Sequence, residues 1–211
     1  MSHPLILSVE TATLSGSVAV TRGDDVIGVI GGDPAISHSN TLLADVDKLL
    51  AQTQLDLAAI DLFAVAAGPG SFTGLRIGIA TIKALAETLG RPCIGIPTLE
   101  AIALSAGVSD RSVALLPAGR GEVFTQLFSV PGENSVAALD EAAHIPPSQL
   151  SERYGRLENV KWCDWRTASP ATHLAPYIAR LALTKFSNNQ IEKAYGLRAV
   201  YVRPADAQLK S

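Results

Sequence analysis

Cysteine, histidine and aromatic residues are scarce in this sequence. Its 211 residues include two cysteines, four histidines and only 5% aromatic residues. Cys93 and Cys163 form no C-x-x-C pair, which favours a reduced, cytoplasmic compartment. No two histidines have the spacing of helical metal ligands, so we expect no zinc or iron site and no metal-dependent catalysis.

Long apolar runs and an excess of basic charge are also missing. No apolar run reaches transmembrane length, and no basic region followed by an apolar stretch opens the chain, so we expect neither a membrane segment nor a signal peptide. The net charge is −3, whereas direct binding of nucleic acid calls for a basic stripe. Any role with RNA would therefore run through a partner.

The chain does contain a glycine-rich corner, GPGSFTGLR at residues 68–76, between an apolar run and a helical pattern. Glycines allow unusual backbone angles, and a helix start can bind anions. Gly70 and Gly74 are one residue too far apart for a dinucleotide fingerprint, and Leu75 stands where a Walker loop needs lysine. A corner without a ligand and an anion site both stay open. The candidate residues, including the possible N-caps Ser71 and Thr73, are Gly68, Gly70, Ser71, Thr73, Gly74 and Arg76.

The first half of the chain alternates in the order β-β-β-α-β-α-β-α. Three short strands precede a helix with one apolar stripe, and parallel strands then alternate with helices. This is the order of a ribonuclease-H-like α/β domain. The expected strands are residues 5–9, 17–21, 26–31, 62–67 and 93–96, and the expected helices follow residue 40 and span 77–89 and 98–106.

The second half is less regular, and the boundary between two domains is expected near residues 106–110. We assign residues 1–106 to an N-terminal lobe and residues 107–211 to a smaller C-terminal lobe. The helix predicted after Ser169-Pro170 contains Pro176, which either kinks it or shifts its start. The strands expected in this half are 113–116, 122–130, 159–163 and 199–202, with a short helix at 149–154.

Several segments together resemble one known family. ILSVETAT at residues 6–13, AGPGSFTGLRIG at 67–78 and GIPTL at 95–99 are similar to bacterial TsaB, also called YeaZ, and GEVF at 121–124 and YVRPADA at 201–207 resemble its later landmarks. The resemblance implies an actin-like (ASKHA) fold in two lobes with a shortened second lobe. It also implies a subunit of the complex that makes threonylcarbamoyladenosine at position 37 of tRNAs reading codons that begin with A.

In that family this subunit is not the catalyst. The resemblance implies that it binds a catalytic paralogue, TsaD, and with it the ATPase TsaE, which are expected to carry the metal and ATP. We therefore expect no catalytic residue and no cofactor in the isolated subunit, contact with tRNA only through the complex, and a homodimer when the subunit is alone. The helix that carries metal-binding histidines in the paralogue reads TLEAI here, at residues 98–102.

The first turn departs from the family. Glu10 stands where many members have aspartate, so Glu10, Thr11 and Thr13 are interpreted as a degenerate phosphate loop, with Glu10 as a solvated carboxylate. Pro117 and Gly119 replace residues that are often acidic and arginine. An actin-like nucleotide hydrolase, a metalloprotease-like enzyme and a dimeric domain with some other partner remain alternatives.

Two helices flanking the corner are the predicted partner surface. The helix over residues 75–89 is apolar around most of its circumference, which indicates burial on more than one side. We expect Ile82→Glu or Gly78→Arg to leave a folded protein that no longer pairs. The predicted interface residues are Leu42, Leu43, Val46, Leu49, Leu75, Gly78, Ile79 and Ile82.

Overall fold

A twisted five-stranded sheet forms the N-terminal lobe. The computed structural model describes residues 3–32, 38–164, 173–191 and 193–202. The strand order is β3-β2-β1-β4-β5; β1, β2 and β3 pair antiparallel, and β4 and β5 run parallel to β1. This order is the ribonuclease-H-like arrangement predicted from the sequence. The bounds are Leu5–Glu10 (β1), Ser17–Arg22 (β2), Asp25–Gly31 (β3), Leu62–Gly68 (β4) and Cys93–Pro97 (β5).

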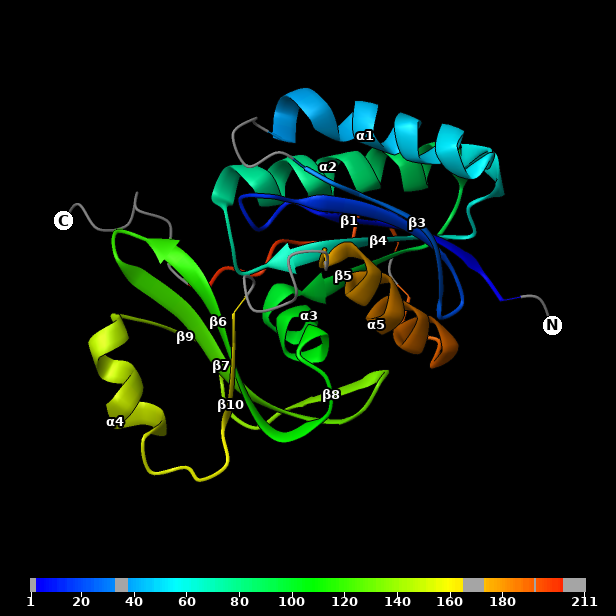
Figure 1. Cartoon of the computed structure of the whole chain (residues 1–211). Helices are drawn as coiled ribbons and strands as arrows, with labels where there is room; N and C mark the ends of the chain where they lie inside the picture. The colour runs from blue at the N-terminus through cyan, green and yellow to red at the C-terminus, as the bar shows by residue number, and fades with distance from the viewer. Residues whose placement is uncertain (1–2, 33–37, 165–172, 192, 203–211) are drawn as a thin grey trace.

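Helices cover both faces of this sheet (Figure 1). On one face, α1 (His38–Thr53) packs on β2 and β3 while α2 (Phe72–Leu89) packs on β4 beside it. The other face carries α3 (Thr98–Ser105) and α5 (Ala175–Ser187). Because both faces are covered, every residue of β1 and β4 is buried, which explains why β4 is apolar along its whole length and β1 along most of it.

A second sheet forms the C-terminal lobe, in the order β10-β6-β7-β8, with β9 paired to β7 (Figure 1). Its centre is a long antiparallel hairpin of β6 and β7, and β10 runs parallel to β6. A short 3-10 turn, η2 (Pro147–Gln149), leads into the small helix α4 (Leu150–Tyr154). The strand bounds are Ser109–Gly119 (β6), Glu122–Gly132 (β7), Ser135–Ala138 (β8), Ala143–Ile145 (β9) and Lys161–Asp164 (β10).

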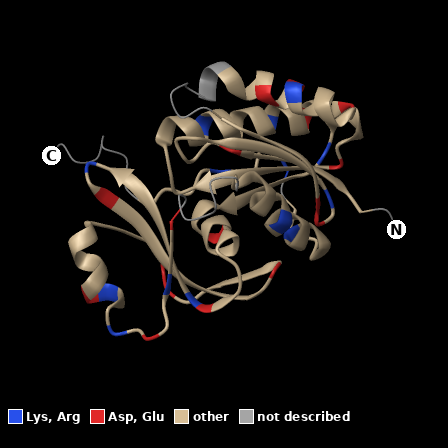
Figure 2. Cartoon of the chain, viewed as in Figure 1, with Lys and Arg blue, Asp and Glu red and all other residues tan. Residues whose placement is uncertain are grey.

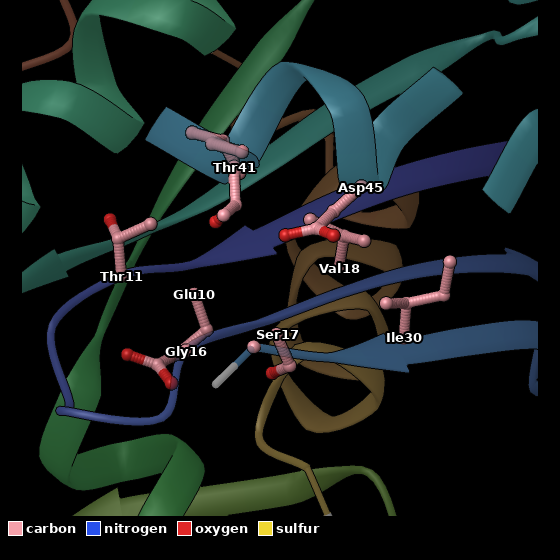
Figure 3. Close-up of a pocket in the computed structure, with 10 residues that line it drawn as sticks. Glu10, Thr11, Gly16, Ser17, Val18, Ile30, Thr41 and Asp45 are labelled. Atoms are coloured by element: carbon pink, nitrogen blue, oxygen red, sulfur yellow. The ribbon is translucent and has the colours of Figure 1, made fainter. Parts of the chain in front are cut away.

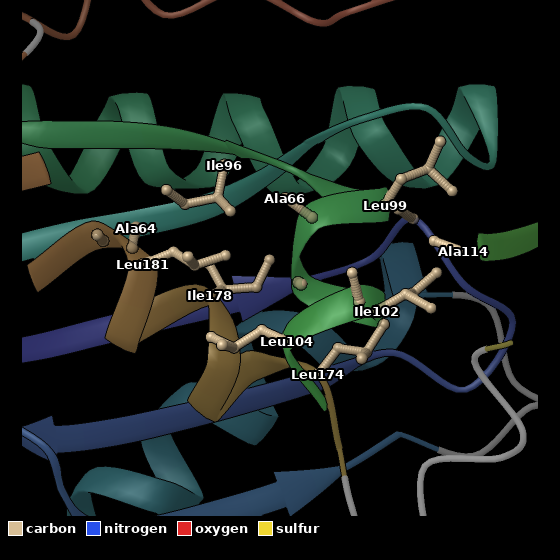
Figure 4. Close-up of a cluster of buried hydrophobic side chains, with 14 of the residues drawn as sticks. Ala64, Ala66, Ile96, Leu99, Ile102, Leu104, Ala114, Leu174, Ile178 and Leu181 are labelled. Atoms are coloured by element: carbon tan, nitrogen blue, oxygen red, sulfur yellow. The ribbon is translucent and has the colours of Figure 1, made fainter. Parts of the chain in front are cut away.

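The two lobes share one hydrophobic core, with α3 between the sheets (Figure 4). Leu99 and Ile102 of α3 are fully buried, as are Ile96 of the first sheet and Phe128 of the second. Helix α5 belongs to the second half of the chain but packs against the first sheet. The assignment of domains at residues 106 and 107 stays a prediction, because this core crosses the division.

Most predicted elements are confirmed, with corrections at their ends. Helix α2 begins at Phe72, a turn and a half before the predicted residue 77. Pro176 lies in the first turn of α5, so it shifts the helix start and does not kink it; Ser169-Pro170 lies outside the described residues. The strand predicted at residues 199–202 is wrong, since this stretch forms no ladder. The remaining elements of the structure are the short strands β8 and β9 and the 3-10 turn η1 (Leu57–Ala59).

Candidate functional site

The glycine-rich corner joins β4 to α2, and backbone N–H groups at its helix start form hydrogen bonds within the chain. Ser71 is the N-cap of α2, and its hydroxyl accepts a hydrogen bond from the backbone N–H of Gly74 at 3.2 Å. The backbone N–H of Ser71 donates to the carbonyl of Ala12 at 2.8 Å. Two N–H groups that could have held an anion at this helix start are thus satisfied within the chain.

Two of these glycines are needed because the β1–β2 turn approaches too closely for a side chain. A Cβ atom at Gly70 would lie 2.6 Å from the carbonyl oxygen and Cβ of Ala12, and one at Gly74 would overlap the carbonyl oxygen of Thr11. The hydroxyl of Thr11 donates to the carbonyl of Gly74 at 2.7 Å. The corner is therefore a docking surface for the chain's own first turn.

Glu10 does not lie in solvent, so its interpretation as a solvated carboxylate is wrong. It is 2% exposed, and its two carboxylate oxygens accept hydrogen bonds from the backbone N–H and the hydroxyl of Thr13, both at 2.7 Å. Thr13 in turn accepts from the N–H of Gly16 at 3.2 Å. The carboxylate thus stabilises the turn between β1 and β2.

A small cleft, partly open to solvent, lies between this turn and the start of α1 (Figure 3). Thr41 and Asp45 enter it from α1, opposite Glu10 and Ser17. Its lining contains two carboxylates and no lysine or arginine, which suits a phosphate group poorly. Within the described part of the chain, no three His, Cys, Asp or Glu side chains are grouped as metal ligands would be.

The turn between β6 and β7 is a tight hairpin in which Gly119, Arg120 and Gly121 all have positive φ (79°, 52° and 78°). Beside it, the imidazole of His144 lies 2.8 Å from the carboxylate of Glu122 and packs against the ring of Phe124, with 5.3 Å between ring centres. These contacts hold β9 against β7. They place His144 next to the carboxylate of Glu122.

The predicted interface residues divide sharply by exposure. Leu43 of α1 is 63% exposed, whereas the other seven are buried against the chain's own sheet and between the two helices. Ile82 is completely buried, and a Cβ at Gly78 would overlap the hydroxyl of Thr11. These seven residues are therefore core in the isolated chain, and whether a partner contacts the two helices stays a prediction.

A different stripe of α2 faces outward. Phe72, Arg76, Ala80 and Ala84 are four residues apart in turn and all exposed, so they share one side of the helix. We call them the outward stripe. The sequence pattern did not reveal this stripe because alanine and isoleucine both count as apolar. In the structure, Ala80 and Ala84 are exposed on α2, whereas the larger Ile79 and Ile82 are buried.

The end of the described chain returns to the glycine corner. The N–H of Val200 donates to the carbonyl of Ala67 at 2.7 Å, and Gly68 has no room for a side chain because the carbonyl of Val200 lies against it. Ala67 falls at a register shift between β4 and β5, which leaves its carbonyl available. This single bond explains why no strand forms here, and it places Tyr201 beside Phe72.

Comparisons with known proteins agree with this architecture. Residues 20–172 match the family model described as TsaD, tRNA N6-adenosine threonylcarbamoyltransferase. The tRNA threonylcarbamoyladenosine biosynthesis protein TsaB of Escherichia coli is 30% identical over 179 residues, which cover 83% of this chain and 75% of that protein. An uncharacterised protein of Mycobacterium tuberculosis is 30% identical over 158 residues, 74% of each chain.

Among solved structures, YeaZ from Pseudomonas aeruginosa superposes with a TM-score of 0.77 at 22% identity, covering 94% of this chain and 99% of that one. This likeness and the family match together confirm the two-lobed α/β fold of the actin-like class. With the fold and the relatives in agreement, the chain belongs to the TsaB (YeaZ) family.

Proposed function

We propose that this protein is a non-catalytic binding subunit in the biosynthesis of tRNA threonylcarbamoyladenosine, acting in the cytoplasm. It binds the catalytic paralogue TsaD and, together with TsaD, the ATPase TsaE. The names of its relatives support the pathway, since the similar Escherichia coli protein is called a tRNA threonylcarbamoyladenosine biosynthesis protein. The catalytic steps then belong to the partners.

The observation that carries this proposal is the self-contained glycine corner. At the place where an actin-like enzyme would hold phosphate, the N–H of Ser71 is bonded to Ala12 and the carboxylate of Glu10 to Thr13. The corner supports the N-terminal end of α2 and leaves α1 and α2 as an exposed pair of helices. A binding role uses this arrangement as it stands, whereas a nucleotide hydrolase would have to break it.

The exposed sides of α1 and α2 are the proposed partner surface. They present Leu43 and Ala44 from α1 and Ala80 and Ala84 from α2, so another helix could approach both closely. In isolation, we expect the same surface to pair two copies of this chain. Figure 2 shows lysine and arginine spread over both lobes in that view, in keeping with tRNA contact through the complex and not through this subunit alone.

Size-exclusion chromatography with light scattering tests the proposal. The purified chain is mixed with TsaD from the same organism, and then with TsaD, TsaE and ATP. We expect a stable complex with TsaD and a larger one when TsaE is added. A chain that elutes apart from TsaD under every nucleotide condition would contradict the proposed function.

A further inference from the structure

A cation and two aromatic rings meet at the exposed start of α2. The guanidinium carbon of Arg76 lies 3.8 Å from the centre of the Phe72 ring, and the ring of Tyr201 lies 5.7 Å from that ring, tilted by 41°. Phe72 is 47% and Tyr201 51% exposed, and Arg76 is also exposed. We call these three residues the aromatic–arginine cluster.

Arg76 is positioned but not neutralised. The guanidinium lies over the Phe72 ring in a cation–π contact, and this contact does not use the hydrogen-bonding capacity of its N–H groups. Among the described residues, no carboxylate lies within ion-pair distance of it. A planar guanidinium in this state is suited to bidentate binding of a carboxylate.

The glycine corner holds the cluster in shape. Phe72 follows the N-cap Ser71 directly, so the start of α2 determines where its ring lies. Tyr201 is held through the hydrogen bond from Val200 to Ala67 and the close approach at Gly68. Because these contacts restrict where the two rings can lie, less conformational entropy is lost when a partner binds.

Phe72 and Arg76 of the cluster form one end of the outward stripe, which extends along α2 to Ala80 and Ala84. The two alanines let a partner helix approach the backbone of α2, and the cluster then meets one end of that helix. Tyrosine, phenylalanine and arginine are enriched in protein interfaces, and tyrosine and arginine are also frequent at their energetic hot spots. RNA fits less well, since the chain has a net charge of −3 and the cluster supplies a single unpaired cation.

We propose that the aromatic–arginine cluster anchors the partner protein by binding one of its carboxylates through Arg76, while Phe72 and Tyr201 pack against an adjacent apolar side chain. This inference rests on the proposed function, which makes TsaD the partner. It adds a specificity residue: Arg76 selects a partner helix with an acidic side chain at the matching position. Seven of the eight residues first predicted for the interface are buried in the isolated chain, whereas Phe72 and Arg76 lie on the exposed side of α2.

The test measures the affinity of TsaD for the parent and for Arg76→Gln, Arg76→Lys and Phe72→Leu at low and high salt. Arg22→Gln is the matched control, because Arg22 is also an exposed arginine but ends β2 on another part of the lobe. We expect Arg76→Gln to bind about a hundredfold more weakly, since removing one partner of a charge pair leaves the other unpaired. Arg76→Lys should be intermediate, and Arg22→Gln should bind as the parent does.

Two further readouts separate this role from a structural one. The parent's affinity should fall as salt is raised, while that of Arg76→Gln should change little. The double variant Phe72→Leu/Arg76→Gln should lose less binding free energy than the sum of the two single losses, because the ring acts by positioning the cation. Parent and variants should melt at the same temperature.

Each result has a distinct meaning. If the parent binds TsaD and Arg76→Gln binds equally well, the cluster is not the anchor, although the proposed function stands. If the parent does not bind TsaD at all, both proposals fail. If Arg76→Gln binds TsaD normally but weakens a complex with tRNA, the cluster is an RNA contact and the carboxylate anchor is wrong.

Discussion

The hydroxyl of Thr11 donates a hydrogen bond to the carbonyl of Gly74 at 2.7 Å, and this contact ties the β1–β2 turn to the first turn of α2. Because the two backbones touch, a methyl group at Gly74 would overlap the carbonyl of Thr11. Gly74→Ala should therefore lower the free energy of unfolding by about 1–3 kcal/mol, an overpacking cost that exceeds the gain in helix propensity of up to about 1 kcal/mol.

Urea denaturation checks this prediction, with Gly132→Ala as the control. Gly132 lies at the end of β7 and has open space where a Cβ would be placed, so its replacement should be nearly neutral. Equal midpoints for Gly74→Ala and the parent would show that the turn can move away from α2.

The isolated chain should bind ATP and magnesium weakly or not at all. The N–H groups of Ser71 and Gly74 already donate within the chain, and Glu10 is buried under Thr13, so binding would have to break these bonds first. Isothermal titration calorimetry, with TsaE as the positive control, is the measurement. A dissociation constant in the micromolar range for the chain alone would overturn this account of the corner.

A charged side chain introduced into α2 should have opposite effects on folding at an exposed and at a buried position. Ala80 is exposed on the outward stripe, so Ala80→Arg should stay folded and lose its complex with TsaD. Ile82 is completely buried, so Ile82→Glu should unfold the protein, because an unpaired carboxylate in the core costs several kcal/mol. This replaces the expectation from sequence that Ile82→Glu would remain folded.

Circular dichroism and light scattering distinguish the two variants. The interface would lie elsewhere if folded Ala80→Arg still bound TsaD as tightly as the parent does. A native spectrum and normal melting for Ile82→Glu would show that α2 is not packed as described.

Burial raises the pKa of the Cys163 thiol from 9.0 to about 12, with a smaller opposing effect from Lys161. The folded protein therefore keeps this thiol protonated at pH 8–9, where the unfolded chain begins to ionise. Its contribution to stability is complete below about pH 9 and is lost as the pH rises toward 12.

Alkylation with iodoacetamide, read at the Cys163 peptide by mass spectrometry, checks this thiol. We expect slow labelling at pH 8 in buffer and rapid labelling in urea. Rapid labelling of the native protein would mean that β10 opens readily or that the thiol is not buried.

The sequence predicted the N-terminal lobe well because local patterns decide it. The run that became β4 is apolar throughout, the run that became β1 is mostly apolar, and Ser71 carries an N-cap signal typical of a helix start. The orientation of α2 could not be predicted, since alanine is apolar and yet tolerates solvent. Only its packing distinguishes Ala80 from Ile82.

Contacts between distant parts of the chain were also beyond sequence reasoning. Tyr201 meets Phe72 because one backbone hydrogen bond brings residue 200 to a register shift in β4. Glu10 looks like a turn residue by its neighbours, but the β1–β2 turn folds over it and buries it. Neither relationship has a periodic signal in the sequence.

We propose that the protein enables threonylcarbamoyladenosine formation by binding TsaD and that it does not catalyse the reaction itself. The most direct measurement is the yield of threonylcarbamoyladenosine on tRNA in a reconstituted reaction with TsaD, TsaE, ATP and the activated threonylcarbamoyl donor. We expect product when the parent chain is present with TsaD and TsaE, none with the parent chain alone, and little when the Ala80→Arg variant replaces the parent. Full product from TsaD and TsaE without this chain, or product from this chain alone, would contradict it.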